Sequence, residues 1–153
     1  MQIDDYYLME QALDEAKKGL TEGEVPVGAV ICDQEGEIIS RAHNRPIALS
    51  DPTAHAEILA LRSACSLLGN YRIKEAILVV TIEPCVMCMG AALNARISRL
   101  LYGAADPKSG AAGSVYSLHQ DNRLNHSIEV ISGVMEEECR KIMKGFFHGR
   151  RGG

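Results

Sequence analysis

The sequence predicts an α/β protein with three layers, α/β/α, built around a mixed five-stranded sheet. Helical and strand patterns alternate in the order α-β-β-α-β-α-β-(α)-β-α, which is typical of a sheet covered by helices. A short turn separates the first two strand patterns, so we expect them to pair as an antiparallel hairpin. Helices join the later strands, which favours parallel pairing through right-handed crossovers. The length fits one domain, and we expect it to span residues 1–153.

The first third of the chain predicts one helix and then the hairpin. Residues 4–20 carry acids early and lysines late, as the helix dipole favours, and their apolar residues recur at helical spacing at Leu8, Ala12, Ala16 and Leu20. Residues 25–32 are apolar and β-branched but include a proline and a glycine, which predicts a strand with an irregular entry. The segment 33–36 (Asp-Gln-Glu-Gly) predicts the turn, and 37–41 the second strand.

A loop and a second helix follow. Residues 43–51 have no periodic pattern and are expected to be loop. Asp51-Pro52-Thr53 is a helix-start signal in which either Asp51 or Thr53 can cap the helix. We expect this helix to run from about 54 to 68, before Gly69.

The second half predicts the remaining strands. Residues 76–81 are continuously apolar, as a central strand buried on both faces should be. A helix opened by Glu83-Pro84 is expected to reach about residue 95, and a strand to span 97–102. After the glycine-rich segment 103–113, we expect a short helix near 115–119, a strand at 128–131 and a last helix at 135–147.

Composition excludes several classes of protein. The formal net charge of −4 and the pI of about 5.7 argue against binding nucleic acid by bulk charge. The charge is uneven, however, with a net −8 in residues 1–40 and a net +4 in the rest. No apolar run approaches the length of a membrane span, and residues 1–10 carry acids instead of a basic signal-peptide start, so no membrane partner is expected.

The five cysteines do not suggest a disulfide framework. Their number is odd, and no secretory signal precedes them. We therefore expect a cytoplasmic protein in which some cysteines bind metal or take part in chemistry.

Two short motifs predict a metal site. Cys85 and Cys88 are three residues apart, which places both thiols on one face of a helix. With His55 they make three zinc ligands, and a three-ligand site leaves its fourth position for a water whose pKa zinc lowers to about 7. Glu57 lies two residues beyond His55 and could accept a proton from that water. The combination is the apparatus for hydrolytic attack at an electron-poor carbon.

Other interpretations of these motifs remain open at this point. The Cys-x-x-Cys pair alone is also typical of a redox pair or of half a zinc ribbon. A structural zinc site needs a fourth protein ligand, but the other cysteines fall in a strand, a helix interior and the last helix. A redox pair would leave His55 and Glu57 without a role.

The motifs resemble those of the zinc-dependent cytidine deaminase-like superfamily, through His55-Ala-Glu57 and Pro84-Cys85-x-x-Cys88. Within it the wider sequence is similar to the family of bacterial tRNA adenosine deaminases. The segments that carry this similarity are 23–30, 42–46, 51–57, 83–91, 110–114, 124–126 and Phe146-Phe147. The resemblance covers nearly the whole chain and implies the three-layer fold of the superfamily.

The resemblance implies a function for individual residues. It implies that the three ligands hold one zinc ion per chain and that Glu57 shuttles protons. Asn44 would hydrogen-bond the flipped nucleoside, while Pro26 and Val27 would wall the base pocket. The RNA contacts that it implies are Asp106 beside the target, Asn125 and His126 around a neighbouring nucleotide, and Arg150 in a basic tail that reaches the anticodon stem.

Three functions are compatible with these residues. The first is hydrolytic deamination of adenosine to inosine at the wobble position of a tRNA anticodon stem-loop, by a homodimer as in the family. The second is deamination of a free base or nucleoside such as guanine, cytosine or cytidine, which would not need Asp106, Asn125, His126 or the basic tail. The third is a non-catalytic, zinc-stabilised subunit, whose signature would be loss of the glutamate, and Glu57 is present.

Overall fold

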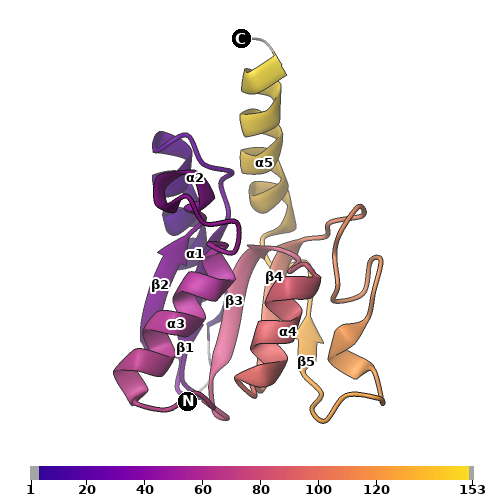
Figure 1. Ribbon diagram of the computed structural model, residues 1–153. Helices are drawn as coiled ribbons and strands as arrows, with labels where there is room; N and C mark the ends of the chain where they lie inside the picture. Colours follow the sequence, from indigo (N-terminus) through magenta and orange to yellow (C-terminus); the bar gives the residue numbers. More distant parts are fainter. Residues whose placement is uncertain (1–3, 152–153) are drawn as a thin grey trace.

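A mixed five-stranded sheet forms the centre of the molecule (Figure 1). The computed structural model describes residues 4–151, with only the backbone of Arg150 and Arg151. The strands lie in the order β2-β1-β3-β4-β5, and their bounds are β1 (Gly28–Cys32), β2 (Ile38–His43), β3 (Ile77–Ile82), β4 (Arg99–Ala104) and β5 (Glu129–Ile131). β1 is antiparallel to β2 and β3, whereas β3, β4 and β5 are parallel. The predicted mixed sheet and its hairpin are confirmed.

Helices cover both faces of this sheet, which confirms the three layers. α3 (Ala56–Leu68) and α4 (Val86–Asn94) lie side by side in front of the sheet in Figure 1. α1 (Asp5–Thr21) and α5 (Glu136–Arg151) belong to the opposite layer. α5 continues beyond the edge of the sheet, toward the top of the view. Among residues 4–151, no helix is long and apolar enough to cross a membrane.

Strand β3 separates two hydrophobic cores. Leu78 and Val80 are fully buried in the core shared with α3 and α4. Ile77 and Val79 point the other way, into the core shared with α1 and α5. Alternate side chains of a strand face opposite sides of a sheet, so a strand buried on both sides must be apolar throughout.

The short helices differ from expectation. Pro46–Leu49 forms a helix, α2, inside the segment predicted to be loop. The buried carboxylate of Glu24 accepts hydrogen bonds from the backbone N–H groups of Ile47 (3.1 Å) and Ala48 (2.8 Å), so a partner distant in sequence stabilises this turn. The helix expected near 115–119 is a single 3₁₀ turn, η1 (Leu118–Gln120).

The predicted cap of α3 is wrong. The helix begins at Ala56, its N-cap is His55, and that side chain makes no capping hydrogen bond. The Asp51 carboxylate instead accepts from the backbone N–H (2.8 Å) and the hydroxyl (2.7 Å) of Thr53, which closes a turn before the helix.

Candidate active site

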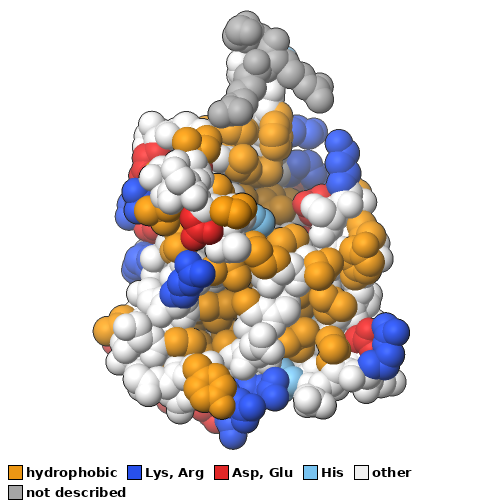
Figure 2. Space-filling model, viewed as in Figure 1, with side chains coloured by type: hydrophobic (Ala, Val, Ile, Leu, Met, Phe, Trp, Pro, Cys, Tyr) orange, Lys and Arg blue, Asp and Glu red, His pale blue; other side chains and the backbone are white. Residues whose placement is uncertain are grey.

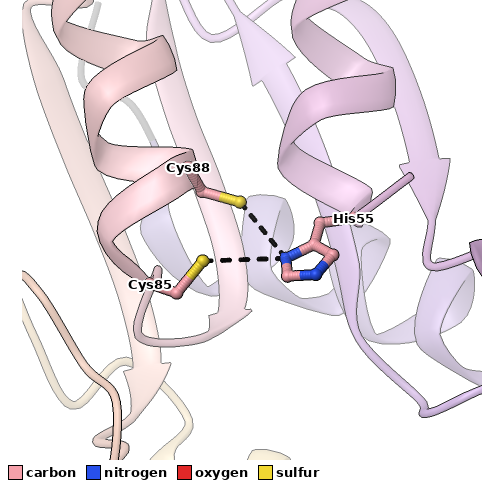
Figure 3. A group of neighbouring side chains, drawn as sticks. All are labelled: His55, Cys85 and Cys88. Carbon is pink, nitrogen blue, oxygen red and sulfur yellow. Dashed lines mark hydrogen bonds between the residues drawn. The ribbon is translucent and has the colours of Figure 1, made fainter. Parts of the chain in front are cut away.

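The three candidate ligands meet at the N-terminal ends of α3 and α4 (Figure 3). His55 and Cys85 are the N-cap residues of the two helices, and Cys88 lies in the first turn of α4. The Nδ1 atom of His55 lies 3.7 Å from the Sγ atom of Cys85 and 3.4 Å from that of Cys88. The three ligand atoms all lie within 4.8 Å of one another, close enough to share one metal ion.

The chemistry of these donors suits zinc. One imidazole nitrogen and two thiolate sulfurs match the ligand set of catalytic zinc sites that keep a fourth position open. A thiol must lose its proton to bind the metal. Hydrogen bonding with Cys88 and His55 lowers the pKa of Cys85 to about 4. The pKa of Cys88 is raised by the same hydrogen bond to Cys85 and by burial, an effect that a bound cation would oppose.

Glu57 lies beside this group in the first turn of α3. The residue is buried, with only 4% of its surface exposed to solvent. Burial raises the pKa of the carboxyl group to about 7, because desolvation disfavours the charged form. A carboxyl group that titrates near neutrality can both accept and return a proton during a reaction at pH 7.

Asn44 links Val27 to the residue that follows the histidine ligand. Its backbone N–H donates to the carbonyl oxygen of Val27 over 3.1 Å. Its side-chain Oδ1 accepts from the backbone N–H of Ala56 over 2.7 Å, directly after His55. Asn44, Val27 and the neighbouring Pro26 are all buried. The structure thus links Asn44 and Val27 to the start of α3, and contact of these residues with a nucleoside stays a prediction.

Asp106 shapes its own loop. Its carboxylate accepts from the backbone N–H groups of Lys108 (3.0 Å) and Ser109 (3.2 Å) and from the hydroxyl of Ser109 (2.8 Å). The residue is half-buried, and the side chains after it are exposed. An RNA contact by Asp106 stays a prediction.

Asn125 and His126 are not brought to the metal group within one chain. Asn125 is exposed, and Nε2 of His126 donates to the carbonyl oxygen of Ile97 over 2.8 Å. Ile97 lies just beyond the C-terminal end of α4, whereas Cys85 lies at its N-terminal end. The nine residues of α4 separate the two ends by about 13 Å. Arg150 lies on α5, but its side chain is outside the described residues.

Two buried acids near the site escaped the reasoning from sequence. Glu24 and Glu83 are 1% and 3% exposed. Glu24 accepts hydrogen bonds from backbone N–H groups of α2, and Glu83 accepts them from backbone N–H groups of the 106–114 loop. Both adjoin residues of interest, Glu24 beside the 25–27 segment and Glu83 one residue before Pro84. The sequence signal that could have identified both residues is an acid placed in an otherwise apolar segment or next to a metal-binding motif.

Comparisons with known proteins agree with this geometry. The family model for the cytidine and deoxycytidylate deaminase zinc-binding region matches residues 2–104. The chain is 48% identical to a tRNA-specific adenosine deaminase of Haemophilus influenzae, over 96% of this chain and 85% of the relative. It is 46% identical to a tRNA-specific adenosine deaminase of Bacillus subtilis, over 99% and 92% of the two chains.

A solved structure has the same fold. It comes from a study of A-to-I editing by tRNA:A34 deaminases at the wobble position of transfer RNA. It matches with a TM-score of 0.86 and 46% identity, over 89% of this chain and 98% of the other. The chain therefore belongs to the zinc-binding cytidine and deoxycytidylate deaminase family and, within it, to the tRNA-specific adenosine deaminases.

Proposed function

We propose that this protein hydrolyses adenosine to inosine at the wobble position of a tRNA anticodon stem-loop, using one zinc ion per chain. The observation that carries the proposal is the convergence of His55, Cys85 and Cys88 beside the buried Glu57. The 48% identity to a tRNA-specific adenosine deaminase supports adenosine in tRNA over a free base or nucleoside. The presence of Glu57 disfavours a non-catalytic subunit.

The chain's own residues account for the proton transfers. Zinc, when bound by its three ligands, supplies an activated water at neutral pH. In the reaction, water oxygen adds to C6 of adenine and the C6–N bond to the amino group breaks, releasing ammonia. Glu57 takes one proton from the water and delivers it to N1 of the base. It then takes the second proton from the hydroxyl group now on C6 and gives it to the leaving amine.

Asn44 would orient the flipped nucleoside. Its Oδ1 atom is occupied by the N–H of Ala56, so the amide Nδ2 is the atom left for the substrate. It would therefore donate to an acceptor of the base or ribose. Pro26 and Val27 would form the apolar wall next to it.

A groove between the loop after β4 and α5 supports RNA binding. Its volume is about 980 Å³, and its basic lining residues are Lys108, Arg140, Lys144 and His148. Phe147 also lines it and is 48% exposed, so its ring is available to stack on a base. Figure 2 shows lysine and arginine side chains beside α5, at the upper right of a hollowed surface. We assign Asp106 to the rim of this groove, Asn125 and His126 to a nucleotide neighbouring the target, and Arg150 to the anticodon stem.

The apolar face formed by α3 and α4 supports a homodimer. Figure 2 shows hydrophobic side chains gathered across the centre of this face. Exposed members on α4 and in the loop after β4 are Val86, Val115 and Tyr116. Extended apolar surface of this kind marks a protein interface. We expect sedimentation to show a dimer that a Tyr116→Glu substitution weakens.

The remaining assignments follow from the same family membership. We propose that residues 1–153 form a single deaminase domain. None of the five cysteines forms a disulfide, and we propose that the enzyme is cytoplasmic.

One experiment tests the activity. Total tRNA is sequenced before and after incubation with the purified, zinc-loaded protein. We expect an A-to-G change confined to one wobble position, because inosine is read as guanosine. Guanine, cytosine and cytidine are assayed in parallel, and comparable activity on any of them would overturn the proposal.

A further inference from the structure

Glu83 connects two segments: the turn 83–85 that leads into the ligand Cys85, called the metal-ligand turn below, and the 106–114 loop that borders the groove. Its buried carboxylate lies two residues before Cys85. Oε1 accepts from the backbone N–H of Asp106 (3.0 Å) and from the hydroxyl of Ser114. Oε2 accepts from the backbone N–H groups of Ala112 (3.0 Å) and Ser114 (3.0 Å). One carboxylate therefore binds both ends of the 106–114 loop.

The loop is folded around this carboxylate. A Cβ atom at Gly110 would overlap the carboxyl group of Glu83, although the φ of Gly110 is not in the left-handed region. Glycine is therefore needed at 110 for space alone. The backbone N–H of Ala111 also donates to the carbonyl oxygen of Pro84 over 2.8 Å, which adds a second link to the ligand turn.

The same loop forms one side of the groove. Asp106, Pro107, Lys108 and Ser109 line it opposite α5. Displacement of these residues would change the width of the groove, and none of them belongs to the metal-binding group.

We propose that Glu83 is a positioning residue that sets the distance between the metal-ligand turn and the groove wall, and thereby the affinity for the RNA around the target base. This inference rests on the proposed tRNA function. Glu83 does not contact the reacting atoms. It acts through the backbone of the 106–114 loop, so its removal should affect substrate binding more than the chemical step.

The Glu83→Gln variant tests the carboxylate with almost no change in shape. Its amide group can accept through only one atom. If the amide NH₂ takes the place of Oε1, the hydroxyl of Ser114 can rotate to accept, but the N–H of Asp106 loses its partner. Loss of this hydrogen bond loosens the half-buried start of the 106–114 loop, and we expect KM for the anticodon stem-loop to rise roughly tenfold with kcat changed little. Zinc content should stay near one per chain.

Hydrogen exchange gives a readout that needs no substrate. In Glu83→Gln the amides of Asp106, Ala112 and Ser114 should exchange at least about tenfold faster, with the amides of β1 and β3 unchanged. Glu35→Gln, at an exposed position, is the matched control and should change neither KM for the stem-loop nor the exchange rates of the 106–114 loop. If the wild type forms no inosine, the proposed function fails, but this arm still reports on Glu83.

A double-mutant cycle gives a second, milder perturbation. Gly110→Ala should displace the carboxylate and reproduce the faster exchange and the raised KM. In a Glu83→Ala background the added methyl group has space, so Gly110→Ala should cause no further change. Equal effects of Gly110→Ala in both backgrounds would overturn the proposal. So would a fall in kcat or zinc content at unchanged KM, or a loss of protection throughout the sheet.

Discussion

The side-chain oxygen of Asn44 accepts the backbone N–H of Ala56 over 2.7 Å, so the residue expected to bind the nucleoside also holds the first turn of the helix that presents His55. This N–H is one of the helix N-terminal donors that have no partner within the helix. Asn44 therefore has one atom for the fold and one for the substrate. The two roles can be separated by substitution.

Asn44→Ala and Asn44→Asp should differ in stability but not in binding. Alanine leaves the buried N–H of Ala56 unpaired, and we expect about 1–3 kcal/mol lower free energy of unfolding. Aspartate keeps an acceptor at a helix N-terminus, where it is favourable, and should be less destabilising. Both variants lack the amide donor, so both should raise KM for the stem-loop. Urea unfolding with kinetics checks this, and equal destabilisation by the two substitutions would contradict it.

The sheet could be predicted because its signals are local. The apolar run that became β3 is buried on both faces, and the turn at 33–36 joins two strands that do pair. The missed helix α2 has the opposite origin. Its backbone N–H groups donate to the carboxylate of Glu24, which lies more than twenty residues earlier in the chain. A pattern of neighbouring residues cannot reveal such a distant acceptor.

The metal group could be predicted because ligand spacing is a chemical requirement. Two thiols at helical spacing need a further ligand to hold zinc, and a histidine near a helix start can supply it. The structure brings the three ligand atoms within 4.8 Å of one another. The distance from the site to His126 could not be predicted, because it depends on which end of α4 its loop reaches. The hydrogen bond to Ile97 determines that position.

Glu57→Gln and Glu57→Ala should abolish inosine formation. Neither side chain can accept and return a proton, whereas the three metal ligands are unchanged. We expect zinc near one per chain by atomic spectroscopy and a loss of rate of at least about 100-fold. Residual activity near the wild-type level would mean that another group moves the protons.

Cys85→Ala should remove the metal and with it both activity and stability. Two protein ligands remain, which is too few for a tight tetrahedral site. We expect little bound zinc, a lower Tm and no inosine, and a chelator should reproduce the effect in the wild type. The wild type should also release zinc as the pH falls, because protons compete for thiolate and imidazole ligands. Cys65→Ala, a thiol outside the site, should leave zinc content unchanged.

Glu15 should contribute stability that is lost in acid. Burial acts to raise the pKa of this carboxyl group, but the hydrogen bonds from Lys18 (2.7 Å) and His43 (3.3 Å) outweigh it, so the pKa lies below its ordinary value of 4.5. A depressed pKa means that the ionised form stabilises the fold above 4.5 and that this contribution disappears as the pH falls through the folded-state value. The stability difference between the wild type and Glu15→Gln should therefore be constant near neutrality and shrink below pH 4.5. The exposed Glu10→Gln on the same helix is the control, and a difference that grows in acid would contradict the assignment.

Deletion of residues 149–153 should weaken binding of the anticodon stem-loop and flatten its salt dependence. The segment contains Arg150 and Arg151, and each arginine that neutralises a phosphate contributes about 0.7–0.9 to the slope of log K against log salt. Without these two arginines the slope should therefore be smaller by up to about 2. Fluorescence anisotropy from about 50 to 200 mM salt measures it. Lys17→Gln removes one exposed cation on α1, in the layer opposite the helices that carry the ligands, and should leave the slope unchanged. An unchanged slope after the deletion would show that the arginines are only solvated, because the salt dependence reflects charge neutralised at the phosphates and not the net charge of the chain.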